Sequence, residues 1–314
     1  MSDRQARTYA SLHQAFLEWA RRLGCATRTT SELDLALARY LDMLYFEGFS
    51  QSRGQKTVAA LRYYRPECEL NGPRGLVHTR AALSGFRRRA PGGTRRPLPR
   101  PAYLAILGAA LHLRLKEFAL ALVIAWDGFL RLPTDIVEMV GGSLVAPSPS
   151  AGVLVRGLLL FPSEAARPSK VGHFDEGMLL KGREASLLDA SLHALKRGST
   201  PSGRLWSFDS AEFRRLFTRC ATLANLGHLK PYQLRHGAAS HAALAGELAP
   251  DQIQERLRHL QAKSTRRYQR HTRYLAEWSR LEPSLLQYAK DVEERLLTYY
   301  LRGGPAPPGA RRAA

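Results

Sequence analysis

The chain has 314 residues, 45% of them hydrophobic, which is enough for two domains and a sizeable buried core. Lysine and arginine number 47 against 27 aspartate and glutamate, which gives a formal net charge of +20. Because the basic residues recur along the whole chain and do not form one juxtamembrane cluster, we expect a nucleic acid as the partner and not a membrane surface.

Cysteine content and hydropathy exclude further classes of protein. Cys25, Cys68 and Cys220 are scattered, and they offer neither a disulfide framework nor metal-ligand spacing. The N-terminal residues lack the apolar run of a signal peptide, and the most apolar segment, 118–130, is too short to span a bilayer and contains Asp127. We therefore expect a soluble intracellular protein without metal or cofactor, located with DNA in a eukaryotic nucleus or in the nucleoid or cytoplasm of a bacterium.

Residues 1–89 are expected to form a helical bundle. Apolar residues recur at helical spacing over four runs, and Phe16 and Trp19 lie on the stripe of the first. The last two runs carry arginines, among them Arg62 and Arg65. These side chains either contact DNA phosphates or form a solvated face, and we predict DNA contact.

Residues 90–101 form the clearest boundary in the sequence. Prolines and glycines preclude a helix here, while Arg95, Arg96 and Arg100 keep the segment charged. We expect a basic linker between two domains that lies along DNA, with these three arginines in contact with it.

Residues 102–301 are expected to form a second domain that is mainly helical with a small β-sheet. Helical apolar spacing dominates, and it ends with one long helix at 285–301. Residues 152–161 predict a strand, and 178–180 form a second short apolar run beyond a polar turn. The fold class is therefore mainly α with a small sheet (α+β). The Gly, Pro, Ala and Arg-rich tail, 302–314, is expected to be disordered.

Two arginines are candidates for binding a phosphate. Metal-free phosphodiester transfer needs cations for the phosphoryl oxygens, a nucleophile and an acid for the leaving oxygen. The planar fork of arginine binds two phosphate oxygens and stays charged. Arg131 and Arg235 follow or lie within apolar helical sequence, where an unpaired guanidinium is costly to bury. For Arg131 the simpler partner is Asp127, four residues earlier on the same helix face.

Tyr268 is the candidate nucleophile. A tyrosine in an amphipathic helix is by itself more often a core residue. However, His259, Arg266 and Arg267 lie in the same short region, and cations near a phenol favour the phenolate that attacks. Tyr274 is the next candidate, and Arg266 and Arg267 are also predicted to contact DNA.

The order and spacing of these residues resemble the tyrosine recombinases of the phage-integrase type. His259 and Tyr268, nine positions apart, resemble the terminal box of that family. Arg235 and its neighbours resemble the second arginine box, and the stretch around Arg131 resembles the first. The agreement extends over most of residues 100–280.

The resemblance implies a function. It indicates a site-specific DNA recombinase or integrase, from a divergent branch such as a mobile element, that acts on double-stranded DNA as a tetramer and needs no cofactor. In such an enzyme Tyr268 attacks a phosphodiester and forms a 3′-phosphotyrosyl bond. Arg131 and Arg235 stabilise the transition state, and His259 assists.

The resemblance also assigns a leaving-group acid and the two domains. Lys170 would protonate the departing 5′ oxygen from the predicted turn, with Lys181 as the alternative. Residues 1–89 would be the core-binding domain and 102–301 the catalytic domain. The final predicted helix, 285–301, would be one that is passed to a neighbouring subunit.

The chain departs from the family pattern at three positions. Tyr232 stands where the family usually has a histidine. A phenol donates a hydrogen bond to phosphate but is a poor base at pH 7, so removal of the nucleophile's proton falls to His259 or to water. Thr134 stands where an acid is expected, with Asp135 one position later, and Arg258 replaces the usual glycine before the terminal histidine.

Two other functions are consistent with the sequence. One is a catalytically inactive DNA-binding regulator on the same fold, which a covalent protein–DNA adduct would exclude. The other is an unrelated basic helical protein that binds RNA or acts as a scaffold. Equal and salt-sensitive binding to RNA and DNA would favour that protein.

Overall fold

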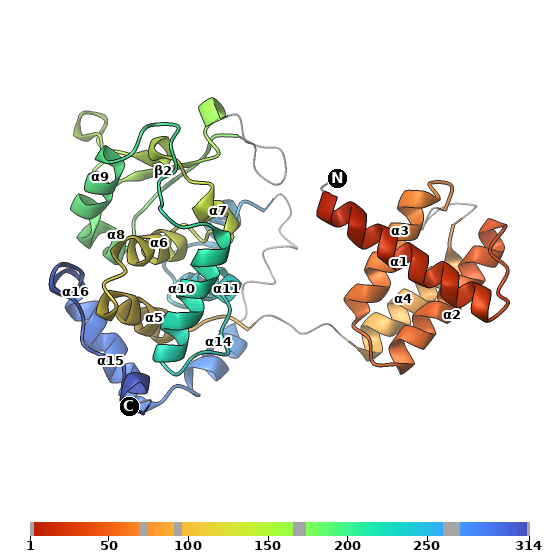
Figure 1. Ribbon diagram of the computed structural model, residues 1–314. Coiled ribbons are helices and arrows are strands. Elements are labelled where there is room, and N and C mark those ends of the chain that lie inside the picture. Colours follow the sequence, from red (N-terminus) through yellow and green to blue (C-terminus); the bar gives the residue numbers. More distant parts are fainter. Residues whose placement is uncertain (1–2, 69–74, 91–95, 166–173, 260–270, 313–314) are drawn as a thin grey trace. The chain divides into compact units, whose positions relative to one another are not determined.

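Figure 1 shows the computed structural model, and the structure describes residues 3–68, 75–90, 96–165, 174–259 and 271–312. The protein is mainly α-helical with a small three-stranded antiparallel sheet, as the sequence predicts. It divides into two compact units, residues 1–94 and 95–314, and the division falls inside the segment 90–101. In the described ranges, no helix is both long enough and apolar enough to cross a membrane.

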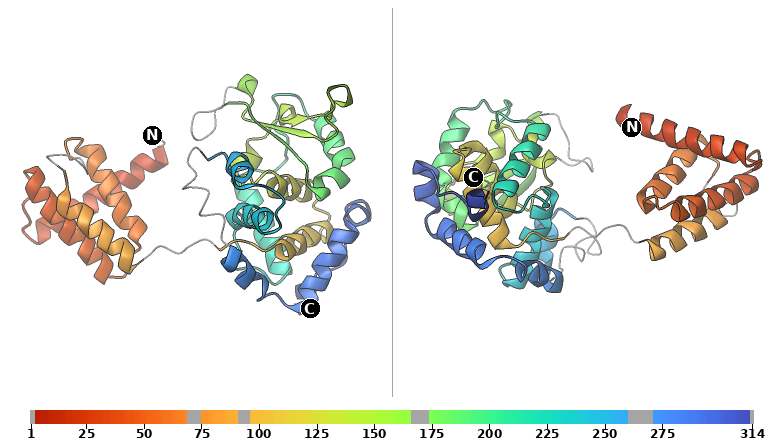
Figure 2. Two further views of the ribbon diagram at one scale, coloured as in Figure 1. Left: turned by 180° about the vertical axis from the view of Figure 1, so that it is seen from behind. Right: turned by 60° about the horizontal axis from the view of Figure 1, so that its bottom comes forward.

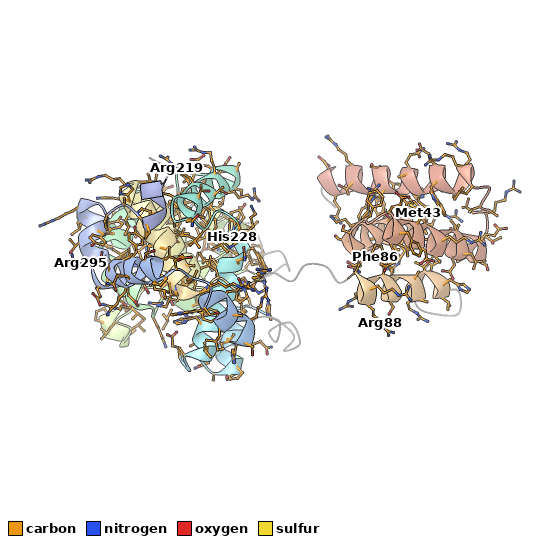
Figure 3. The ribbon with its side chains drawn as sticks, turned by 90° about the horizontal axis from the view of Figure 1, so that it is seen from below. Met43, Phe86, Arg88, Arg219, His228 and Arg295 are labelled. Atoms are coloured by element: carbon orange, nitrogen blue, oxygen red, sulfur yellow. The ribbon has the colours of Figure 1, made fainter. Side chains whose placement is uncertain are left out.

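Helices α1 (Asp3–Arg22), α2 (Thr30–Phe46), α3 (Gln51–Tyr64) and α4 (Val77–Arg89) form the N-terminal unit. A capping box starts α2, because Thr29 Oγ1 accepts from the main-chain N–H of Glu32 and the Glu32 carboxylate accepts from that of Thr29. The core of this unit includes Phe16 and Phe86. Figure 3 shows Phe86 on the inner side of α4 and Arg88 pointing away from the bundle.

The C-terminal unit is built around two helices that are buried on nearly all sides. These are α5 (Arg100–His112) and α6 (Lys116–Asp127), and neither has a polar face after its first turn. Helices α10 (Ser210–Leu223), α11 (Tyr232–Leu244) and α15 (Pro283–Glu294) pack against them. The other described helices of this unit are α7 (Thr134–Val137), α8 (Arg183–Leu187), α9 (Asp189–Arg197), α12 (Pro250–Arg256), α14 (His271–Trp278) and α16 (Leu296–Arg302).

The sheet has the order β1 (Leu144–Val145), β2 (Gly157–Leu160), β3 (Glu176–Leu179), with antiparallel pairing throughout. Leu158 pairs with Leu144 on one side and with Met178 on the other. The small sheet predicted from the runs 152–161 and 178–180 is therefore confirmed, with strands that cover 157–160 and 176–179. The sequence did not predict β1, because two residues are too few for a period-two pattern.

The predicted final helix is two helices, α15 and α16, with a break at Arg295. The apolar face of α15 covers α5 of the same chain: a Cβ on Gly108 would lie 2.6 Å from both Tyr288 Oη and Val292 Cγ2. Figures 1 and 2 show α15 running beside α5. Helix α15 is therefore packed within its own chain, and the expectation that 285–301 is passed to a neighbouring subunit stays a prediction.

The tail also differs from the prediction. Over the described part of 302–314 the chain packs on the C-terminal unit, where Tyr288 Oη donates to the carbonyl oxygen of Pro305 at 3.1 Å and Pro307 is buried. Its composition predicts disorder because it contains few large apolar residues. The folded chain supplies partners from α5 and α15 that local composition does not reveal.

Candidate active site

Arg235 lies at the centre of a cluster in the C-terminal unit. Its side chain is fully buried, at 0% exposure. Nη1 donates to the carbonyl oxygen of Phe129 and Nη2 to that of Leu257, both at 2.5 Å. Those carbonyls lie two residues before Arg131 and two residues before His259. One guanidinium therefore joins the segments that carry the other predicted site residues.

Helix α11 holds Arg235 in place through contact with the main chain near residue 98. A Cβ on Gly237 would lie 1.9 Å from the carbonyl oxygen of Leu98, so only glycine permits this approach. The N–H of Leu98 donates to the carbonyl oxygen of Gln233 at 3.2 Å, and Gln233 Nε2 donates to the carbonyl oxygen of Arg96 at 3.0 Å. The start of the C-terminal unit thus fixes the helix that carries Arg235.

His259 lies beside Arg235, with 3.3 Å between His259 Nε2 and Arg235 Nη2. Burial, and after it the charges of Arg235, Arg131 and Arg258, lower the pKa of His259 to about 4. The imidazole is therefore neutral at pH 7. Because a guanidinium only donates, the hydrogen bond from Arg235 requires Nε2 to accept, which places the ring proton on Nδ1. His259 consequently presents an Nδ1–H donor.

Arg131 lies in the turn after α6 and is partly buried. Its main-chain N–H donates to Asp135 Oδ2 at 2.8 Å. Its Nη1 is buried, and no residue that the structure describes gives it a hydrogen-bond partner. Asp127 instead accepts from Arg256 Nη1 at 2.9 Å. The alternative that Asp127 pairs with Arg131 is wrong, because α6 ends at Asp127 and the helical i,i+4 relationship does not continue to Arg131.

Two departures from the family pattern contact each other. Asp135 and Arg258 form an ion pair, and Arg258 Nε lies 3.0 Å from Glu176 Oε2 at the start of β3. Burial lowers the pKa of Arg258 to about 10, which leaves it charged at pH 7. The sequence analysis assigned neither residue to the site. An acidic and a basic residue at two positions that depart from the family pattern were nevertheless a sign that the two pair with each other.

Tyr232 begins α11 and lies three residues before Arg235, so the two share a helix face. The rings of Tyr232 and His236 are 5.2 Å apart, centroid to centroid. Lys181, the alternative acid, is exposed just after β3. Five further predicted residues lie outside the described residues: Arg95, Lys170, Arg266, Arg267 and Tyr268.

Tyr274, the alternative nucleophile, is a core residue. It is 0% exposed, and its Oη accepts from the main-chain N–H of Arg100 at 2.8 Å and lies 3.1 Å from His241 Nδ1. Burial raises the pKa of Tyr274 above its usual value. A buried, protonated and doubly hydrogen-bonded phenol is poorly placed to attack a phosphodiester.

Arg100 does not have the role that the sequence predicts. Its Nη2 donates to Glu184 Oε1 at 2.5 Å and to Glu293 Oε1 at 2.8 Å, and only 17% of its side chain is exposed. Burial opposes the charge, but these carboxylates hold the pKa of Arg100 above its usual value. The prediction that Arg100 contacts DNA is therefore wrong, because its guanidinium is used inside the protein.

The other described candidates for DNA contact lie at the surface. Arg62 is exposed on α3. Arg65 forms an ion pair with Glu67, and Arg96 lies 3.8 Å from Glu277 with half of its side chain exposed. Neither pair is buried enough to prevent exchange for a phosphate.

No family model and no curated protein matches this chain. Among solved structures, the chain is similar to the XerA recombinase. The alignment covers 90% of this chain and 94% of that chain, at 15% sequence identity and a TM-score of 0.42. The chemistry of the site therefore has to be argued from its own residues.

Proposed function

We propose that this protein breaks and rejoins DNA strands through a covalent tyrosine intermediate. The observation that carries the proposal is the convergence of Arg131, Arg235 and His259 from three separate segments of the chain. The hydrogen bonds of Arg235 to Phe129 and Leu257 produce this convergence. In the described part of the chain, Arg131 Nη1 is a buried donor that no residue satisfies, as expected of a group that binds an external anion.

The charges of the cluster favour an anionic ligand. Arg131, Arg235 and Arg258 bring three guanidiniums together, while Asp135 and Glu176 bring two carboxylates that both contact Arg258. With a neutral imidazole, these groups sum to one positive charge. Like charges in a partly desolvated site repel one another, so a bound phosphodiester would relieve that cost.

In the proposed reaction the Tyr268 oxygen attacks phosphorus, a 3′-phosphotyrosyl ester forms and the bond to the 5′ oxygen breaks. Arg131 and Arg235 neutralise the non-bridging oxygens as charge develops on them. Lys170 gives its proton to the departing 5′ oxygen. Attack of a 5′ hydroxyl on the ester reverses these steps, and rejoining to another strand gives integration, excision or inversion.

His259 acts in this scheme as a hydrogen-bond donor to the phosphate. Its Nε2 lone pair faces Arg235, and its low pKa makes it a weak base. The proton of Tyr268 is therefore passed to water. Tyr232, where the resemblance leads one to expect a histidine, contributes a second neutral donor.

The surrounding basic residues hold the duplex in this proposal. Arg62 and Arg65 of the N-terminal unit, the core-binding domain, contact phosphates. Arg95 and Arg96 do so from the linker, and Arg266 and Arg267 from beside the nucleophile. Four subunits assemble on two DNA sites, as the resemblance implies.

A nicked suicide duplex tests the proposal. The duplex carries the DNA that flanks the gene, and cleavage next to the nick releases a short fragment that cannot diffuse back. A denaturing gel should show a protein–DNA adduct, and mass spectrometry of the digested adduct should place the DNA on Tyr268. A wild-type protein that shifts this duplex in a native gel without forming an adduct is a DNA-binding regulator and not an enzyme.

A further inference from the structure

Arg258 has a backbone conformation that its residue type does not favour. Its φ is 53°, in the left-handed region that glycine adopts without a Cβ clash. The residue lies between Leu257, whose carbonyl oxygen accepts from Arg235, and His259, whose ring contacts the same guanidinium. A glycine would make this turn without strain, so the Arg258 side chain has to contribute something that offsets it.

The Arg258 side chain is held between two carboxylates. It pairs with Asp135 and lies 3.0 Å from Glu176 Oε2, and only 7% of it is exposed. The Asp135 oxygen that pairs with Arg258 also accepts from the main-chain N–H of Arg131 at 2.8 Å. Two successive contacts therefore connect the main chain before His259 to the main chain of Arg131.

We propose that Arg258 is a positioning residue that holds Arg131 and His259 in a fixed arrangement around one phosphate. The proposal rests on the proposed function and adds a residue to it. Arg235 joins the same two segments through main-chain carbonyls, and Arg256 joins them farther from the site through Asp127. The connection through Arg258 and Asp135 is the one that reaches the main chain of Arg131 itself, and the contact with Glu176 ties both segments to β3.

Substitution of Arg258 by methionine tests this role. Arg258→Met keeps an unbranched apolar side chain in place of the arginine stem and removes both ion pairs. Arg156→Met is the matched control, because the Arg156 side chain is also largely buried and its ion pair is with Asp189, at 2.7 Å, at the start of α9. We expect adduct formation under single-turnover conditions to slow by about tenfold to a hundredfold in Arg258→Met and to stay near wild type in Arg156→Met. Duplex affinity should stay within about threefold of wild type in both variants, because neither arginine is proposed to contact DNA.

Binding of inorganic phosphate, measured by calorimetry, gives a second readout that needs no catalysis. Arg258→Met should weaken phosphate binding by about tenfold, and Arg258→Lys should recover part of the loss because an ammonium group reaches one carboxylate. Arg258→Gly relieves the backbone strain, so it should keep the thermal midpoint yet bind phosphate as weakly as Arg258→Met. If Arg258 served only the fold, phosphate affinity would fall only in those Arg258 variants whose thermal midpoint also falls.

The outcomes separate the inference from the proposed function. If wild type forms the adduct and Arg258→Met changes neither its rate nor phosphate affinity, the positioning role is wrong and the enzyme stands. If wild type forms no adduct but Arg258→Met weakens phosphate binding, the enzyme proposal fails and the positioning role stands. A wild-type protein that neither binds phosphate nor forms an adduct overturns both.

Discussion

Arg235 Nη2 lies 3.3 Å from His259 Nε2, although 24 residues separate the two in sequence. A permanently charged guanidinium at this distance opposes protonation of the imidazole. The pair therefore requires a neutral His259, and the hydrogen bond decides which ring nitrogen carries the proton. Burial of the imidazole, followed by the charge of Arg235, lowers the pKa of His259, and we therefore expect the protein to lose stability in acid and His259 to act as a donor.

Stability should depend on pH through His259. Its native pKa is about 4, below the value of about 6.5 for an unfolded histidine, so the unfolded state binds more protons between these pH values. The free energy of unfolding therefore falls as the pH drops from about 6.5 to about 4. Above about pH 6.5 His259 is unprotonated in both states, so it takes nothing from the free energy of unfolding. Because the imidazole is partly exposed and solvent screens its charge, we expect the free energy of unfolding to fall by about 1–2 kcal/mol, less than the full pKa difference implies. Urea denaturation at pH 7.5 and pH 4.5 measures it.

The comparison uses His259→Asn, which cannot titrate. This variant should lose less stability than wild type over the same interval. His228→Asn is the matched control, because His228 lies exposed on the surface of the C-terminal unit (Figure 3). Equal losses in wild type and His259→Asn would mean that folding does not lower the pKa of His259.

Arg131 and Arg235 should differ in their effects on stability but not in their effects on the reaction. Arg235→Ala leaves the buried carbonyls of Phe129 and Leu257 without their donor, so the free energy of unfolding should fall by about 3 kcal/mol. Arg131→Ala removes a cation with an unsatisfied buried nitrogen and should leave stability unchanged or slightly higher. Each variant should form the adduct at least about a hundredfold more slowly.

Single-turnover rates and thermal midpoints, measured on the same samples, check this pair. A large loss of stability in Arg131→Ala would show that its guanidinium serves the fold. Adduct formation at the wild-type rate in either variant would remove that arginine from the proposed transition state.

The sequence predicted three residues that the structure brings together, but not the contacts that support them. Arg131, Arg235 and His259 were recognised from residue type and order, and their catalytic roles stay predictions. The ion pairs of Arg258 with Asp135 and Glu176 were not predicted, because Glu176 reaches the cluster only through the register of β3 in the sheet. Side-chain pairing across distant segments depends on tertiary geometry, which spacing along the chain does not encode.

The local rules failed where an element ended or where distant residues supplied partners. The i,i+4 rule would pair Asp127 with Arg131, but α6 ends at Asp127. The long apolar run at 285–301 was expected to be one helix, but it breaks at Arg295. The mainly helical fold class followed from apolar periodicity, because amphipathic helices bury one face wherever the core lies.

The tail should stabilise the C-terminal unit. A chain that ends after Arg302 loses the hydrogen bond from Tyr288 Oη to Pro305 and the burial of Pro307. We expect the free energy of unfolding of this unit to fall by about 1–3 kcal/mol, measured by urea denaturation. Tyr288→Phe removes only the hydrogen bond, so its loss should be smaller. An unchanged unfolding midpoint in the truncated chain would show that the tail contributes nothing to the fold.

Tyr268 and Tyr274 should respond in opposite ways to the same substitution. Tyr268→Phe removes the proposed nucleophile, so adduct formation should be abolished while duplex affinity stays within about threefold of wild type. Tyr274→Phe removes a hydroxyl that accepts from Arg100 and contacts His241, so the protein should lose about 1–2 kcal/mol of stability and still form the adduct. Denaturing gels with the suicide duplex, run beside thermal melts of both variants, make the comparison. An adduct that persists in Tyr268→Phe and disappears in Tyr274→Phe would require the buried phenol to leave its two partners, and the proposed nucleophile would then be wrong.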